Sequence, residues 1–136
     1  MEIKSFLLPK EKVSYLTTSA SMQEAIERLE ACHYTAIPMI DEKGKYVGTL
    51  SEGDLLWKLK YTPDLTFVNM NEIAVTDIRT RIYNECVAIN AHMEDMLALA
   101  ADQNFVPVVD NERDRQFLGI IRRKDIIAYY TRNITD

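Results

Sequence analysis

The sequence predicts an α/β (α+β) protein made of two β-α-β-β-α repeats that pack sheet to sheet about a pseudo-twofold axis. Three observations predict this fold. Two amphipathic helical stretches recur at an offset of 71 residues, each is followed by an apolar run with an early proline, and each half ends in another helical stretch after a glycine-containing strand. Such units leave one apolar sheet face uncovered, so the two copies are expected to bury those faces against each other.

Each repeat is expected to open with a brief strand, at 12–16 and 86–89, and to continue into an amphipathic helix. Apolar residues at i, i+3, i+4 and i+7 place one buried stripe on each helix. The stripes are Met22, Ala25, Ile26 and Leu29 in the first repeat and Met93, Met96, Leu97 and Ala100 in the second. Ser21 with Glu24 predicts a capping box for the first helix, and Asn90 predicts the N-cap of the second.

A β-hairpin is predicted after each of these helices. The runs AIPMID and FVPVVD are predicted as first strands, because an early proline fits the start or the edge of a strand. Pro38 and Pro107 are 69 residues apart, so the second repeat has lost two residues between helix and strand. The turns DEKGKYVG and DNERDRQFLG, the second of them longer, restore the offset of 71.

Both repeats are predicted to end in a helix, from Ser51 to about Lys60 and from Arg122 to about Thr131. Ser51 and Asp54 have the spacing of a capping pair. The predicted domains are repeat 1 at 5–60, a linker at 61–71 and repeat 2 at 72–132.

The composition excludes several classes of function. A net charge of -5 gives the protein no general attraction for nucleic acid or an anionic membrane, and its apolar runs are too short to span a bilayer. The N-terminal stretch has no signal-peptide core, so a cytoplasmic location is expected. Cys32 and Cys86 form neither a disulfide framework nor a C-x-x-C pair. We identify no metal cluster, P-loop or nucleophile–base pair, so we expect no cofactor and no enzymatic activity.

The junction before the last helix differs in charge between the repeats. In GIIRRKDII the cations Arg122, Arg123 and Lys124 replace the S-E-G of GTLSEGDLL. Cations at a helix start oppose the macrodipole by up to about 1 kcal/mol each, which a surface helix tolerates. However, unpaired N–H groups there attract anions, and guanidinium groups bind phosphate through charge-assisted hydrogen bonds of about 1.5 to 3 kcal/mol. Phosphate binding is the favoured interpretation, and tolerated surface charge is the alternative.

The apolar-x-Pro strands and the G-h-h-S-x-x-D junction GTLSEGD (h is apolar) resemble those of the tandem cystathionine-β-synthase (CBS) domain pair, or Bateman module, over about residues 5–132. Within that superfamily, FLLPKEKVSYL, YTAIP, INAHMEDMLALAADQNFVPVVD and GIIRRK are similar to small stand-alone CBS proteins of Gram-positive bacteria that bind cyclic di-AMP. Arg122 departs from the serine of the junction pattern, whereas Asp125 is retained, which keeps linear adenine nucleotides in consideration.

The resemblance implies an adenine in a cleft between the repeats. One cleft would use Lys12, Ser14, Thr35, Ala36 and Ile37 together with Arg122, Arg123, Lys124 and Asp125. A possible second cleft would use Ser51, Asp54, Val87, Ala88 and Phe105. There Asp54 would either accept ribose hydroxyls or serve only as the acid of the helix cap, and the bulk of Phe105 disfavours occupancy. Tyr34 would either stack on a base or belong to the core.

The resemblance also implies a function. It is that of a regulatory adenine-nucleotide-binding protein, most specifically a cyclic di-AMP receptor that controls a partner protein, and the implied partner is a stringent-response nucleotide synthetase. A homodimer through the terminal helices would cover their excess apolar residues, whose alternative place is the internal core. These residues are Leu55, Leu56, Trp57, Leu59, Ile126, Ile127, Tyr129 and Tyr130. Two other functions stay open: an AMP, ADP or ATP energy sensor, and a constitutive interaction module without a ligand.

Overall fold

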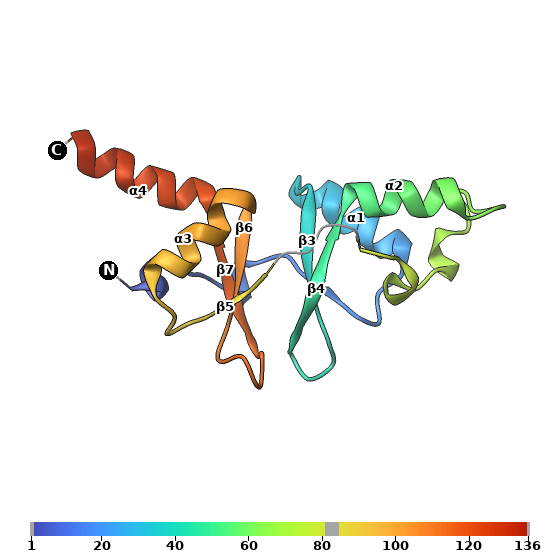
Figure 1. The fold of residues 1–136 in the computed structure, drawn as a ribbon. Helices are drawn as coiled ribbons and strands as arrows, with labels where there is room; N and C mark the ends of the chain where they lie inside the picture. Colours follow the sequence, from blue (N-terminus) through green and yellow to red (C-terminus); the bar gives the residue numbers. More distant parts are fainter. Residues whose placement is uncertain (1, 81–84, 136) are drawn as a thin grey trace. The chain divides into compact units, whose positions relative to one another are not determined.

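The computed structural model describes residues 2–80 and 85–135, and each half of the chain forms a small sheet with two α-helices (Figure 1). The first sheet has the order β2-β3-β4. Strand β2 (Leu16–Thr17) runs parallel to β3 (Ala36–Ile40), which forms an antiparallel hairpin with β4 (Tyr46–Ser51). Helices α1 (Met22–Cys32) and α2 (Glu52–Tyr61) lie on one face of this sheet (Figure 1).

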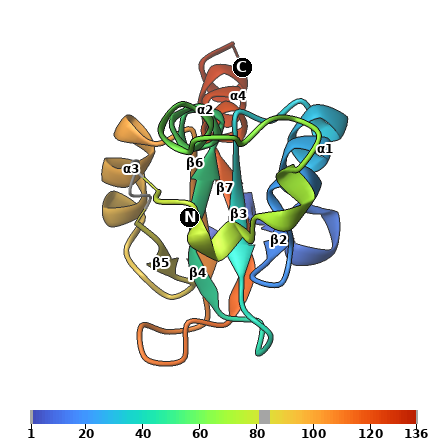
Figure 2. The ribbon, with the colours of Figure 1, turned by 90° about the vertical axis from the view of Figure 1, so that its right-hand side faces the viewer.

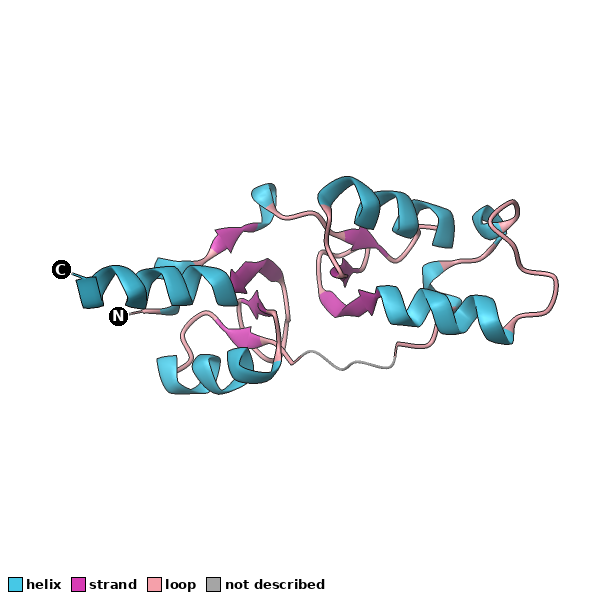
Figure 3. Ribbon diagram, turned by 90° about the horizontal axis from the view of Figure 1, so that it is seen from above, coloured by secondary structure: helices cyan, strands magenta, loops and turns pink. Residues whose placement is uncertain are grey.

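The second half repeats this arrangement. Strand β5 (Val87–Ala88) is parallel to β6 (Phe105–Val109), and β6 is antiparallel to β7 (Phe117–Arg122). Helices α3 (Met93–Asp102) and α4 (Arg123–Thr135) lie on one face of the sheet, as Figure 3 also shows. The predicted β-α-β-β-α order and both hairpins are confirmed. None of the helices in the described part of the chain has the length and apolar character needed to cross a membrane.

The N-terminal segment adds a fourth strand to the second sheet, which was predicted to have three. After a 3-10 turn, η1 (Ile3–Phe6), strand β1 (Leu8–Pro9) pairs antiparallel with β7, and the sheet order is β1-β7-β6-β5. Ile3 and Phe6 are only 1% and 9% exposed because their side chains pack in the core beneath that sheet. The start of the chain therefore stabilises the half that is far from it in sequence.

The strand predicted at 12–16 is also shorter than expected. Lys10–Lys12 form another 3-10 turn, η2, which contacts β7, and β2 begins only at Leu16. Lys12 therefore lies in a turn. The charged run KEK has no apolar residue to place against a core, so it does not continue a half-buried strand.

The chain divides into two compact units, Ser14–Tyr83 and Met1–Val13 with Asn84–Asp136. We use repeat 1 for the first of these units and repeat 2 for the second. These units differ from the predicted sequence repeats in two places: residues 5–13 belong to the second unit, and the predicted linker belongs to the first. The domain boundaries of 5–60 and 72–132 stay a prediction.

The segment after α2 belongs to the core of repeat 1. Two 3-10 turns, η3 (Met70–Glu72) and η4 (Val75–Asp77), place Met70 and Val75 in that core at 4% and 1% exposure. Figure 2 shows this yellow-green segment beside α1, which η3 contacts. The end of the predicted linker therefore takes part in the packing of repeat 1 through Met70, whereas Phe67 and Val68 within it are 70% and 88% exposed.

The predicted N-cap is confirmed for α1 and wrong for α3. The Ser21 hydroxyl accepts a 3.1 Å hydrogen bond from the backbone N–H of Glu24. Helix α3 instead follows His92, whose side chain makes no capping bond, and Asn90 lies further upstream. His92 is the counterpart of Ser21 at the offset of 71. Burial of the apolar stripe therefore sets the helix start, even where a better capping side chain stands nearby.

Candidate functional site

The Arg122 and Asp125 side chains form a bidentate ion pair where β7 passes into α4. Nε of Arg122 donates to Oδ2 of Asp125 at 2.7 Å, and Nη2 donates to Oδ1 at 3.1 Å. The two side chains are 32% and 34% exposed. Two parallel hydrogen bonds fix the plane of the guanidinium, so Arg122 is held in one orientation at the surface of repeat 2.

The Arg123 side chain points to the end of α3. Its Nε donates to the carbonyl oxygen of Ala100 at 2.8 Å, and Nη2 donates to that of Ala101 at 3.3 Å. Its Nη1 donates to Oδ1 of Asn104 at 3.3 Å, and its backbone N–H donates to the carbonyl oxygen of the same residue at 2.9 Å. Arg123 therefore supplies hydrogen bonds and positive charge to the C-terminal end of α3, where carbonyl groups lack partners.

The two repeats end their first helices differently. In repeat 1, His33 adopts a left-handed conformation (φ 56°), and its N–H binds the carbonyl oxygen of Leu29. In repeat 2, the residue after α3, Gln103, is extended (φ -119°), and the connection to β6 is shorter. The connection shortened as the proline spacing predicted has no left-handed residue at this point, although the N–H of Gln103 still binds the carbonyl oxygen of Leu99. The guanidinium of Arg123 binds the carbonyl oxygens of Ala100 and Ala101 in addition.

Lys124 is exposed on the first turn of α4, and η2, which carries Lys12, contacts β7 in the same repeat. The four predicted cations of the first cleft, Lys12, Arg122, Arg123 and Lys124, thus belong to one compact unit. Their environments differ, because Arg122 is paired with an acid and Arg123 caps a helix. Whether these cations bind phosphate stays a prediction.

The corresponding junction of repeat 1 is a buried capping box. The backbone N–H of Ser51 donates to Oδ2 of Asp54 at 2.9 Å, and the backbone N–H of Asp54 donates to the Ser51 hydroxyl at 3.2 Å. The exposures of the two residues are 5% and 1%. The capping role left open for Asp54 is thus confirmed.

The remaining predicted residues of the first cleft belong to repeat 1. Ala36 opens β3 opposite Ser51, and the carbonyl oxygen of the exposed Thr35 accepts a 2.9 Å hydrogen bond from the N–H of Glu52. Ile37 has 0% exposure and packs in the core, so its side chain forms no open wall. Ser14 is half-buried. Tyr34 packs against the core, which was one of the two interpretations of this residue.

The remaining residues of the second cleft lie in repeat 2. Val87 and Ala88 make up β5, and Phe105 is the first residue of β6, opposite Arg122. Val87 and Phe105 are 7% and 9% exposed, whereas Ala88 is half-buried. Whether either predicted cleft forms between the repeats stays a prediction.

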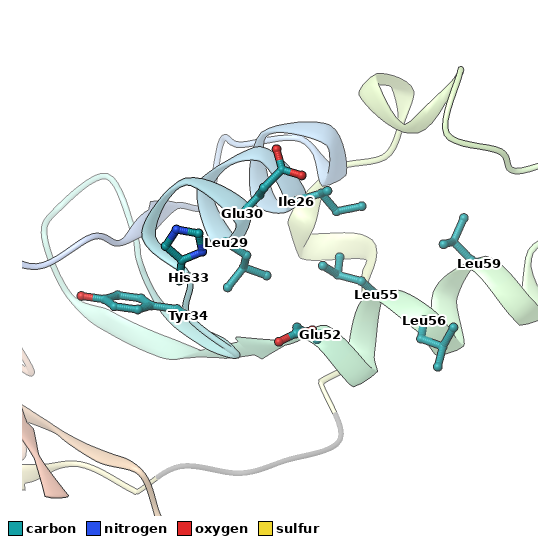
Figure 4. A pocket seen from close by; sticks show the side chains of 9 residues that line it. All are labelled: Ile26, Leu29, Glu30, His33, Tyr34, Glu52, Leu55, Leu56 and Leu59. Atoms are coloured by element: carbon teal, nitrogen blue, oxygen red, sulfur yellow. The ribbon is translucent and has the colours of Figure 1, made fainter. Parts of the chain in front are cut away.

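A groove between α1 and α2 was not predicted. It has a volume of about 490 Å³, and Figure 4 shows Glu30 on α1 and Glu52 at the start of α2 among its lining residues. Its apolar lining consists of Ile26, Leu29, Leu55, Leu56 and Leu59. The sequence signal for this groove was the excess of leucines in α2, which are Leu55, Leu56 and Leu59.

The apolar residues of the two terminal helices, α2 and α4, divide between core and surface. Leu55 and Ile126 are 5% and 7% exposed and complete the cores of their own repeats. Leu59 and Tyr129 are partly buried against the same cores. The exposed residues are Leu56 at 61%, Trp57 at 36%, Ile127 at 57% and Tyr130 at 43%. The internal-core interpretation is thus confirmed for Leu55 and Ile126, and the homodimer that would cover the exposed members stays a prediction.

Comparisons with solved structures show the same fold. A structure described as CbpB in complex with c-di-AMP has a TM-score of 0.85 at 23% identity, covering 100% of this chain and 88% of that one. CbpB of Listeria monocytogenes in complex with c-di-AMP has a TM-score of 0.83 at 23% identity, covering 98% and 97%. CBSX2 in complex with AMP has a TM-score of 0.72 at 26% identity, covering 96% of both chains.

A search of curated proteins found no match. The sequence profile described as the CBS domain matches residues 3–61 and 73–132, one copy for each sequence repeat. The matched residues cover most of the chain, and the structure shows the small sheet and two α-helices in both halves. The chain therefore belongs to the CBS domain family.

Proposed function

We propose that this protein is a regulatory, non-catalytic binding module for an adenine nucleotide, with cyclic di-AMP as the first candidate ligand. Similar folds carry c-di-AMP in CbpB and AMP in CBSX2, which supports the ligand class. The observation that supports a phosphate-containing ligand most directly is the oriented, partly exposed guanidinium of Arg122. A fixed guanidinium loses little freedom when it binds a phosphate.

In this proposal the cations of repeat 2 bind the phosphates. A guanidinium has five N–H donors, and Arg122 uses its Nε and Nη2 groups for Asp125, which leaves donors for an anion. Asp125 then acts by orienting Arg122. Lys124 and Lys12 add charge, while Arg123 contributes chiefly by holding α3 next to the junction.

The adenine is assigned to repeat 1 in this proposal. Ser14 and Ala36 are small and half-buried, and the backbone from Thr35 to Ala36 offers polar groups for the edge of a base. Ile37 takes part through its backbone, since its side chain is buried. Ser14, Thr35, Ala36 and Ile37 are the repeat 1 residues that the family resemblance assigned to the first cleft.

The second site ranks lower. Asp54 is only 1% exposed, so it would have to leave the buried capping box, and with it the backbone N–H of Ser51, to reach ribose hydroxyls. Leaving a buried donor without a partner costs about 1 to 3 kcal/mol. A linear nucleotide such as AMP, ADP or ATP, which would use this acid, is therefore the second candidate, and CBSX2 with bound AMP is the observation in its favour.

The test is calorimetric titration with cyclic di-AMP, AMP, ADP and ATP. Arg122→Ala should weaken binding of cyclic di-AMP roughly ten- to a hundredfold, because a charge-assisted hydrogen bond is lost. Arg113→Ala is the matched control, since Arg113 is exposed in the β6–β7 turn of the same repeat. Equal affinity of all three proteins would remove the phosphate site from this junction. No binding of any nucleotide would favour a constitutive interaction module.

Regulation requires that ligand binding changes the affinity for a partner protein. The family resemblance makes a stringent-response nucleotide synthetase the first partner to test. Binding of this protein to the immobilised synthetase should change when cyclic di-AMP is added, and Arg122→Ala should lose that response while retaining ligand-free binding. An unchanged signal in both conditions would exclude this synthetase as the regulated partner.

We also propose a homodimer. Leu56 and Trp57 on α2 and Ile127 and Tyr130 on α4 expose large apolar surfaces that a second copy would bury. Sedimentation of the protein at micromolar concentration should give a dimer, and Leu56→Ser should shift it toward monomer.

A further inference from the structure

The buried side chain of Gln103 binds the backbone of Glu85, just before β5 in repeat 2. Gln103 is only 8% exposed. Its Oε1 accepts a 2.8 Å hydrogen bond from the backbone N–H of Glu85, and its Nε2 donates to the carbonyl oxygen of the same residue at 3.1 Å. Nε2 also donates to the carbonyl oxygen of Phe105 at 3.2 Å. The N–H can only donate and the carbonyl groups can only accept, so the orientation of the carboxamide is fixed.

The carboxamide of Gln103 has the hydrogen-bonding pattern of an adenine edge. It presents an acceptor, Oε1, beside an amino donor, Nε2. Adenine likewise presents a ring-nitrogen acceptor beside its exocyclic amino group. An adenine therefore carries the acceptor and the donor for the two hydrogen bonds that Gln103 makes with Glu85. Hypoxanthine has a carbonyl group in place of the amino group and lacks this pair.

The counterpart of Glu85 in repeat 1 is Ser14, at the offset of 71. Ser14 is half-buried and lies two residues before β2, just as Glu85 lies two residues before β5. Among the hydrogen bonds of residues 2–80 and 85–135, none involves the backbone N–H or carbonyl oxygen of Ser14. The same backbone edge is thus filled in repeat 2 and open in repeat 1.

The side chain that fills the edge has no equivalent in repeat 1. Gln103 lies two residues before β6, and Tyr34 lies two residues before β3. Tyr34 packs against the core of repeat 1, and its side chain makes no hydrogen bond to any residue that the structure describes. A phenol also lacks the adjacent acceptor and donor of an amide. Tyrosine at this position therefore leaves the backbone edge of Ser14 available.

A base that bound at Glu85 would have to displace Gln103. It would replace existing hydrogen bonds rather than add new ones, and the displaced amide would lose three. A base at Ser14 would add hydrogen bonds to groups that have none in the described chain. The difference favours repeat 1 over the edge beside Val87 and Ala88, which belong to the second predicted cleft.

We propose that the carboxamide of Gln103 is a built-in substitute for an adenine: it closes the base-binding edge of repeat 2 and leaves that of repeat 1 to take the base. This inference rests on the proposed function and deepens it by naming the residue that decides which repeat accepts a base. Gln103 acts here by excluding a ligand, which a purely structural clamp would not do.

Calorimetric titration with AMP and with inosine monophosphate tests this role. Gln103→Ala should bind one more AMP per chain than the unmodified protein. The added site should prefer AMP over inosine monophosphate roughly tenfold, because hypoxanthine cannot replace the amide. Gln103→Met is the matched control: it keeps a side chain of similar length without the amide, and it should bind as the unmodified protein does.

Hydrogen exchange of the unmodified protein gives a second test that does not depend on the folding of a variant. The side-chain amide protons of Gln103 should stay protected at saturating cyclic di-AMP, whereas loss of protection would show that the base displaces them and would overturn the proposal. A folded Gln103→Ala protein without an added AMP site would also overturn it, and binding by the unmodified protein would leave the proposed function intact. Conversely, an AMP-selective site in Gln103→Ala, with no nucleotide bound by the unmodified protein, would support the role of Gln103 and reject the proposed function.

Discussion

The guanidinium of Arg123 donates a 2.8 Å hydrogen bond from Nε to the carbonyl oxygen of Ala100, so a side chain at the start of α4 caps the end of α3. This contact explains why a cation is tolerated at a helix start. The charge lies close to the negative end of another helix, where it is favourable. Arg122 is compensated differently, by the carboxylate of Asp125.

Arg123→Ala should therefore lower the stability of the protein whether or not a nucleotide is present. The lost hydrogen bonds, of which the one to the carbonyl oxygen of Ala100 is partly buried, predict a loss of about 1 to 3 kcal/mol, measured by urea unfolding. Lys124→Ala, the exposed neighbour, is the control and should stay within about 0.5 kcal/mol. Equal effects of the two substitutions would mean that the capping contact adds no stability.

Gly119→Ala should be more destabilising than Gly48→Ala. The two glycines are counterparts with similar backbone angles (φ 154° and 158°), so the strain of adding a side chain is nearly matched. A Cβ at Gly119 would overlap the carbonyl oxygen of Leu8 in β1, whereas one at Gly48 would meet only the flexible end of Met39 at 3.7 Å. The overlap predicts about 1 to 3 kcal/mol of additional loss in thermal or urea unfolding.

The protease sensitivity of the N-terminal segment is a second measurement for Gly119→Ala. Displacement of β1 should make residues 2–13 sensitive to limited proteolysis under native conditions, and Gly48→Ala should leave them protected. If both variants lose the same stability and keep the same cleavage pattern, β1 does not constrain the choice of residue at Gly119.

Ile3→Ala should destabilise repeat 2 although the residue begins the chain. Its side chain is 1% exposed in that core, and large-to-small core substitutions cost about 2 to 5 kcal/mol. Hydrogen exchange should accelerate in β6 and β7 rather than in β3 and β4. The control is Lys4→Ala, whose side chain is 71% exposed. Faster exchange confined to β3 and β4 would contradict the assignment of the N-terminal segment.

Asp41 should make the β3–β4 turn sensitive to acid. Its pKa is lowered from the ordinary value of 3.8, first by the backbone hydrogen bond from Lys45 and also by that from Lys43. A carboxyl group whose pKa is lower in the folded state adds stability above its unfolded pKa and loses that contribution as the pH falls through the folded value. The stability difference between the wild type and Asp41→Asn should therefore shrink from pH 7 to pH 3. A constant difference would show that the charged form is not the one stabilised.

Much of the fold could be predicted because each local pattern agrees with the packing. The stripe of Met22, Ala25 and Leu29 is buried, and both apolar-x-Pro runs are strands in hairpins. The choice of Asn90 as an N-cap failed because capping preference is worth less than placing Met96 and Ala100 in the core. The two-residue strand β1 could not be predicted, because its pairing with β7 involves residues over 100 positions away.

The duplication, the alternation of helices and hairpins, and the charge difference between the two junctions follow from periodicity and residue type, so they are visible in the sequence. The partner of each charge is visible only in the folded chain: Asp125 for Arg122, the α3 carbonyl groups for Arg123, and the capping box for Asp54. It also decided that the N-terminal residues complete repeat 2. The physical reason is that hydrogen-bond partners and core contacts form between segments distant in the chain, whereas a sequence pattern reports only on neighbours.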